Sequence, residues 1–127
     1  FPDEMYKVLT VQSEPLTLEI KHDLIQKFGD KLQFYRSWNE GLEYVSLESG
    51  KGIAVDYLKK HLNGQIHTTV GVWDYENDIT LIEYADIGYA VENSIDEVKK
   101  AADRITVKNT ENAIAAVVKD LEETVLK

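Results

Sequence analysis

Residues 66–91, IHTTVGVWDYENDITLIEYADIGYAV, decide the fold class. The opening segment IHTTVGVW is mostly uncharged and rich in β-branched side chains, which is typical of a strand. The segment NDITLIEYA is predicted to be helical, and IGYAV is a second short apolar strand. A strand, a helix and a strand in succession indicate a parallel sheet with a helical crossover. We therefore expect an α/β fold around this stretch.

The segments on either side of this stretch continue the alternation. Apolar residues at Val55, Leu58 and Leu62 predict an amphipathic helix that ends near Asn63 and Gly64. Ser94 and Glu97 form an S-x-x-E capping box, which predicts a helix over IDEVKKAA. The last helix is predicted from one apolar stripe, made of Ile114, Val117, Val118, Leu121 and Val125.

The N-terminal part of the chain has a different pattern of predicted helices and strands. Residues 6–13, YKVLTVQS, are predicted to form a strand, and apolar residues every fourth position from Leu16 to Phe28 predict a helix that ends at Gly29. Residues 31–38 and 41–48 flank a short Asn-Glu-Gly turn and indicate an antiparallel hairpin. We therefore expect an α+β region over residues 1–46 and a parallel-sheet region over residues 47–127.

Composition excludes several classes of function. The chain has 127 residues, a net charge of -9 and no cysteine, so we expect neither disulfides nor thiolate metal sites nor nucleic-acid binding. No apolar run approaches the roughly 20 residues of a membrane helix, and the start lacks a leader pattern, so we expect a soluble, cytoplasmic protein. Because the first residue is Phe1, we also expect a piece of a longer protein.

Three polar side chains, Asp74, Asn77 and Asp78, follow the first predicted strand of the α/β region. Open α/β sheets bind ligands at the carboxyl ends of their strands, and carboxylates suit Mg²⁺ together with water and phosphate oxygens. A helix N-cap explains one of Asn77 and Asp78 equally well, so both interpretations stay open. An EF-hand is excluded, because Ile79 and Ala85 occupy the positions of its glycine and its bidentate acid.

Lys51 is the second unusual residue, because it begins a predicted helix. The helix dipole disfavours a cation at this end and favours a bound anion, so Lys51 indicates an anion site. A solvated lysine beside a glycine-rich turn is the alternative. The segment is not a P-loop, because Val45 and Gly52 replace its first glycine and its Ser or Thr.

Three segments together resemble a known family: SGKGIAVDYLKKHL, VGVWDYENDITLIEYAD, and YAVENSIDEVKKAADRITVKNTENAIAAVV. In order and spacing they are similar to the C-terminal half of haloacid dehalogenase (HAD) superfamily phosphatases of the Cof type. The resemblance implies that residues 47–127 are the second half of a Rossmann-like parallel-sheet core. It also implies that residues 1–46 are the end of an α+β cap domain inserted into that core.

The resemblance also implies a reaction, in which a small phosphorylated metabolite, such as a sugar phosphate, loses its phosphate through an aspartyl-phosphate with Mg²⁺ bound. Lys51 and Asp78 would be catalytic residues, and Asp74 would be a metal ligand. Lys51, Asn77 and Asn93 would bind the phosphate. Fixed cations stabilise the charge that develops on a transferring phosphoryl group, so this assignment agrees with the pattern of residues.

The sequence departs from the family pattern at several positions. Trp73 replaces a glycine, Glu92 stands where glycine is usual, and Asn112 replaces a common aspartate. The nucleophile motif Asp-x-Asp is absent from these 127 residues, so we expect the chain alone to be inactive.

Two hypotheses about the whole protein follow. The first is the C-terminal portion of a HAD phosphatase, and the rival is a catalytically silent binding or interaction domain that kept the fold. In the family's strand order the strand at residues 66–73 lies beside the nucleophile strand, so its edge would be open. We therefore expect self-association, or association with the N-terminal half of the same protein.

Overall fold

The computed structural model describes residues 5–62 and 64–125, and the predicted helix end at Asn63 lies outside them. The chain divides into two compact units, with the boundary between Gly50 and Lys51. Among the described residues, no helix combines the length and the apolar content needed to cross a bilayer.

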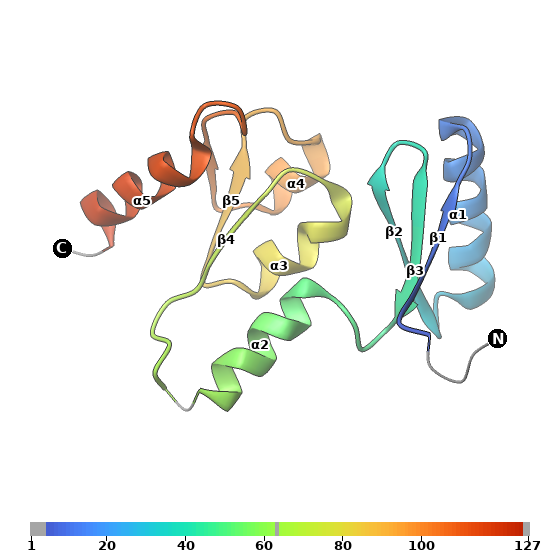
Figure 1. Ribbon diagram of the computed structural model, residues 1–127, viewed down its shortest axis with the longest axis horizontal. Helices are drawn as coiled ribbons and strands as arrows, with labels where there is room; N and C mark the ends of the chain where they lie inside the picture. The colour runs from blue at the N-terminus through green and yellow to red at the C-terminus, as the bar shows by residue number, and fades with distance from the viewer. Residues whose placement is uncertain (1–4, 63, 126–127) are drawn as a thin grey trace. The chain divides into compact units, whose positions relative to one another are not determined.

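The N-terminal unit is a three-stranded antiparallel sheet with one helix packed against it (Figure 1). Its elements are β1 (Lys7–Val11), α1 (Glu14–Phe28), β2 (Leu32–Trp38) and β3 (Gly41–Ser46). The strand order is β1-β3-β2, and β2 and β3 form the predicted hairpin. Buried Phe34 and Leu42 form the centre of this unit. The predicted strand, helix and hairpin are therefore confirmed.

The C-terminal unit is a parallel sheet with helices on both faces (Figure 1). Its strands β4 (Val70–Trp73), β5 (Ile87–Val91) and β6 (Arg104–Thr106) lie in the order β4-β5-β6, all parallel. Its helices are α2 (Lys51–His61), the 3-10 turn η1 (Glu76–Asp78), α3 (Ile79–Tyr84), α4 (Asp96–Ala101) and α5 (Ala113–Thr124). The α/β prediction is confirmed, and β4 is an edge strand of the described sheet.

The alternation of side chains along the strands assigns the two faces of the sheet. Gly88 faces α3, and a Cβ atom at this position would lie 2.3 Å from Ile82 Cγ2, so only glycine allows this close packing. The neighbouring Tyr89 points the opposite way, and its hydroxyl hydrogen bonds to the carboxylate of Asp120 in α5. Figure 1 shows α3 and α4 on one side of β4 and β5 and α5 on the other.

A polar cluster fastens α5 to the sheet. Arg104 Nη1 donates to Asp120 Oδ2 at 2.5 Å, to the Tyr89 hydroxyl at 3.0 Å and to Thr124 Oγ1 at 2.8 Å. Hydrogen bonds from Tyr89 and then Arg104 lower the pKa of Asp120 below its ordinary value. These contacts span three elements and hold α5 against β5 and β6.

Two sequence predictions differ from the structure near the ends of strands. The predicted strand over residues 66–73 begins only at Val70, because the Thr69 amide donates to the side chain of Asp86 instead of to a neighbouring strand. The strand β6 was not predicted, because three residues carry too little pattern to mark a strand.

The helix predicted over IDEVKKAA is confirmed as α4, but its predicted capping box is wrong. Helix α4 begins at Asp96 with Ile95 as its N-cap residue, and none of the side chains that the structure describes caps it. The hydroxyl of Ser94 donates to the carbonyl oxygen of Val91 at 2.5 Å and to that of Trp73 at 3.3 Å. The shorter of these contacts is local, to the residue three positions earlier, and the helix begins one residue later than a box with Ser94 as N-cap requires.

The last helix is confirmed, but only part of its apolar stripe is buried. Ala113 and Val117 are buried, whereas Ile114 and Val118 are 62% and 49% exposed. The exposed part of the stripe is an uncovered apolar face on α5.

Candidate active site

Helix α2 approaches α3 closely because its second residue is a glycine. Gly52 is buried, and a Cβ atom at this position would lie 2.3 Å from the carbonyl oxygen of Thr80. The two backbones therefore meet where any side chain would separate them. This close approach brings Lys51, the first residue of α2, beside the turn that leads into α3.

Lys51 lies between a carboxylate and an aromatic ring. Its Nζ atom is 2.5 Å from Asp78 Oδ1 and 4.3 Å from the centroid of a Trp73 ring. The Lys51 side chain is 50% exposed, whereas the Asp78 side chain is 8% exposed. Contacts between a cation and a ring stabilise by about 0.5–2 kcal/mol, depending on desolvation. The ammonium is thus the counter-charge of a buried carboxylate.

This geometry excludes the capping interpretation of Asp78. The residue occupies the N-cap position of α3, but its side chain makes no capping hydrogen bond. Although Lys51 lies within ion-pair distance, Asp78 Oδ1 accepts no aligned hydrogen bond from any described residue. The 2.5 Å separation makes the contact an ion pair, because charge attraction does not require hydrogen-bond alignment. Asp78 therefore pairs with Lys51 instead of capping the helix.

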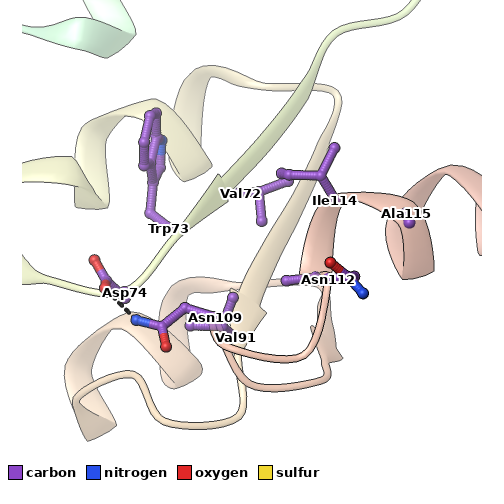
Figure 2. Close-up of a pocket in the computed structure, with 9 residues that line it drawn as sticks. Val72, Trp73, Asp74, Val91, Asn109, Asn112, Ile114 and Ala115 are labelled. Atoms are coloured by element: carbon purple, nitrogen blue, oxygen red, sulfur yellow. Dashed lines mark hydrogen bonds between the residues drawn. The ribbon is translucent and has the colours of Figure 1, made fainter.

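Asp74 and Asn93 are joined by a residue that the sequence analysis missed. The Asn109 side-chain amide lies 3.4 Å from Asp74 Oδ2, and the Asn109 backbone N–H donates to Asn93 Oδ1 at 3.0 Å. Figure 2 shows Asp74 and Asn109 facing each other beyond the end of β4. Asn109 follows β6. Because polar residues that follow parallel strands gather at one edge of the sheet, this residue becomes a candidate once β6 is known.

The remaining predicted site residue, Asn77, is half-buried in η1. It lies in the chain segment between Asp74 and the ion-paired Asp78. All five predicted positions are thus on segments that meet at the carboxyl end of the sheet, and the contacts form two groups. One group holds Lys51 and Asp78, and the other holds Asp74 and Asn93.

A cavity of about 470 Å³ lies on the α5 side of this edge (Figure 2). It is lined by apolar side chains with Asp74, Asn109 and Asn112 as its polar members, and the full lining is Val72, Trp73, Asp74, Val91, Asn109, Asn112, Ala113, Ile114 and Ala115. Asn112 adopts a left-handed backbone with φ 56°, which asparagine tolerates better than most residues. Figure 2 shows the Trp73 side chain pointing away from Asn112 and Ile114.

The donor set matches part of a magnesium site. Within the described residues, no three His, Asp or Glu side chains gather closely enough to hold a metal ion. Asp74 supplies one half-buried carboxylate, whereas Asp78 already neutralises Lys51. Mg²⁺ sites often use one or two carboxylates, with water and substrate phosphate completing the shell. Asp74 fits such a site as one ligand among several.

Comparisons with known proteins show the family to which the chain is similar. The family model of haloacid dehalogenase-like hydrolases matches residues 2–118. Phosphatase YwpJ of Bacillus subtilis is 33% identical over 73% of this chain and 33% of its own length. The 5-amino-6-(5-phospho-D-ribitylamino)uracil phosphatase YwtE of the same organism is 29% identical over 94% of this chain and 41% of its own length.

A solved structure shows the same fold. The HAD/COF-like hydrolase of Plasmodium vivax superposes with a TM-score of 0.82 at 30% identity, over 97% of this chain and 43% of the other. The chain thus spans less than half the length of each of these three relatives. On the family match and this agreement in fold, the chain belongs to the haloacid dehalogenase-like hydrolases of the Cof type.

Proposed function

We propose that this chain is the C-terminal portion of a Mg²⁺-dependent phosphatase that hydrolyses small phosphate monoesters, sugar phosphates in particular. The observation that carries the proposal is the Lys51–Asp78 pair at the carboxyl end of the parallel sheet, beside Asp74. The name of the relative YwtE describes a phosphate ester of a ribityl chain, which supports the substrate class. Residues 1–46 belong to a cap and residues 47–127 to the catalytic core.

Each residue has a role in the proposed reaction. Lys51 holds the transferring phosphoryl group against the nucleophile, because an ammonium offsets charge on its equatorial oxygens. Asp78 fixes the ammonium through the 2.5 Å ion pair. Asn77 and Asn93 offer side-chain amides to the phosphate, and Asp74 is a ligand of the metal. Bound Mg²⁺ would supply further positive charge at the phosphate oxygens.

The nucleophilic aspartate of this proposal lies outside the 127 residues, because they contain no Asp-x-Asp motif. Strand β4 is at the edge of the described sheet, and we assign its outer side to the strand that carries the nucleophile. Until that edge is paired, it is a template for another copy of the chain.

The absence of cysteine also supports a cytoplasmic location.

Assays with p-nitrophenyl phosphate and a panel of sugar phosphates test this proposal. The complete parent protein should hydrolyse them with Mg²⁺, and the 127-residue chain should not. Turnover by the isolated chain that is lost in Lys51→Ala would contradict the missing-nucleophile account.

Titration calorimetry tests the metal assignment separately. We expect the chain to bind Mg²⁺ weakly and Asp74→Asn to abolish the signal, whereas the control Asp86→Asn should retain it. Equal binding by Asp74→Asn and the unaltered chain would remove Asp74 from the metal site.

A catalytically silent HAD-fold domain is the second candidate, and one contact favours it. The Trp73 ring lies over the ammonium that the reaction needs, with Nζ 4.3 Å from the ring centroid. A parent protein that is inactive on the whole panel, with its nucleophile motif present, would select this candidate.

A further inference from the structure

Two buried polar atoms without hydrogen-bond partners lie in the same cluster. Among the described residues, three buried side-chain polar atoms lack such a partner: Ser37 Oγ, Trp73 Nε1 and Asp78 Oδ1. The last two belong to residues that contact Lys51. Native proteins leave few such atoms, and strained or incomplete groups concentrate at functional sites. The Lys51 cluster is therefore more than a structural ion pair.

Within this cluster the ring is fixed and the ammonium is movable. Trp73 packs against the buried core formed by Ile82, Ala90 and Val98. Lys51 reaches the ring through a flexible four-carbon stem and is half exposed. The half-exposed Lys51 ammonium therefore has more conformational freedom than the packed indole.

We propose that Trp73 is a positioning residue that covers Lys51 and competes with an entering phosphate group for its ammonium. This inference rests on the proposed phosphate-binding role of Lys51. A lysine ammonium has three N–H donors, and Asp78 and the indole face already attract it from two directions. A phosphate oxygen must draw the ammonium away from the ring or share it. Trp73 thus lowers the phosphate affinity of the site.

Two substitutions separate the ring face from the volume of the side chain. Trp73→Leu keeps an apolar side chain against the core and removes the aromatic face, whereas Trp73→Phe keeps an aromatic face. The methylene protons of Lys51 next to Nζ should resonate upfield in the unaltered chain because of the indole ring current. We expect this shift to disappear in Trp73→Leu and to persist partly in Trp73→Phe.

Titration with inorganic phosphate, followed through the Lys51 resonances, measures the competition. Trp73→Leu should bind phosphate about two- to fivefold more tightly than the unaltered chain, the factor expected for a partly exposed cation–ring contact. Trp73→Phe should fall between them. Lys51→Met assigns the resonances, and unchanged signals from Ile82 and Val98 verify the fold.

The outcomes distinguish this inference from the proposed function. Equal phosphate affinity of the unaltered chain and Trp73→Leu, with binding in both, overturns the inference and leaves the phosphate role of Lys51 intact. Phosphate that moves the Lys51 resonances in neither protein overturns that role, and the inference with it. An unaltered chain without the upfield shift also overturns the inference. If Trp73→Leu loses its fold, the same comparison with Trp73→Phe decides.

Discussion

The carboxylates at the two ends of the parallel sheet differ in how many hydrogen bonds they accept. At the amino end, Asp86 accepts hydrogen bonds from the amide and hydroxyl of Thr69, both at 2.8 Å, and from Lys59 Nζ at 2.7 Å. At the carboxyl end, buried Asp78 Oδ1 accepts no hydrogen bond from the described residues and has only the Lys51 charge beside it. A satisfied carboxylate indicates a structural role, and an incompletely satisfied one indicates a site that another group completes.

Helix α2 makes this comparison direct, because it contributes a lysine to each end. Lys51 at its first residue meets Asp78, and Lys59 in its last turn meets Asp86. Helix α2 therefore contains two comparable lysines. The helix dipole disfavours the position of Lys51 and favours that of Lys59.

The largest effect on stability should come from removing these lysines one at a time. Lys51→Met leaves the buried Asp78 carboxylate without a partner and should lower the free energy of unfolding by about 1–3 kcal/mol. Lys59→Met should cost less than about 1 kcal/mol, because Asp86 is partly exposed and keeps Thr69. Urea unfolding of both variants measures the difference, and equal losses would remove the distinction between the two ends.

An effect of similar size is expected from adding one methyl group to a glycine. Gly52→Ala should lower stability by about 1–3 kcal/mol, because the Thr80 carbonyl lies 2.3 Å from the new Cβ atom. Gly71→Ala is the control, since its nearest atom, Leu81 O, is 3.1 Å away. Thermal unfolding should rank the two in this order, and the reverse ranking would contradict the close approach of α2 and α3.

A third comparison uses the left-handed backbone at the cavity. Asn112→Ala should lower stability by about 1 kcal/mol, because alanine avoids this conformation. Asn112→Gly should be close to neutral, because glycine adopts it freely. Chemical denaturation tests both variants, and an Asn112→Ala chain as stable as the Asn112→Gly chain would argue against the φ of 56°.

The smallest effect concerns acid stability at the amino end. Hydrogen bonds from Lys59 and Thr69 lower the pKa of Asp86 from 3.8 to about 2. Because the folded pKa lies below the ordinary value, this contribution to stability is complete above pH 3.8 and is lost as the pH falls towards about 2.

Asp86→Asn should therefore lose less stability than the unaltered chain between about pH 5 and about pH 2. Glu83→Gln, an exposed charge change in α3, serves as the control. Parallel pH profiles for the unaltered chain and Asp86→Asn would contradict the assignment.

Local pattern was enough to predict the architecture but not the pairing of side chains. Apolar periodicity predicted α1, the hairpin and the β4–α3–β5 unit, although Leu16 and Phe28 of the α1 pattern are each 43% exposed. Strand β6 escaped prediction because its three residues, Arg104–Thr106, carry too little pattern to mark a strand. Asn109 was missed together with that strand.

The site shows the same limit. Lys51 and Asp78 could be named from the sequence because their residue types suit an anion site. Their ion pair depends on the close packing at Gly52, and the cover by Trp73 depends on which face of β4 its side chain takes. Ser94 is not the cap because α4 begins one residue later, with Ile95 as its N-cap residue, and the Ser94 hydroxyl donates to the carbonyl oxygen of Val91.

The most direct test of the central claim is the turnover of p-nitrophenyl phosphate by the complete parent protein carrying Lys51→Met or Lys59→Met. We predict that Lys51→Met lowers kcat by about 10²–10³-fold, the loss typical when a fixed donor to a developing oxyanion is removed. Lys59→Met, at the structural end of the same helix, should stay within about threefold of the unaltered protein, as expected for an exposed pair. Full activity in Lys51→Met, or equal losses in the two variants, would contradict the assignment of catalysis to the carboxyl end of the sheet.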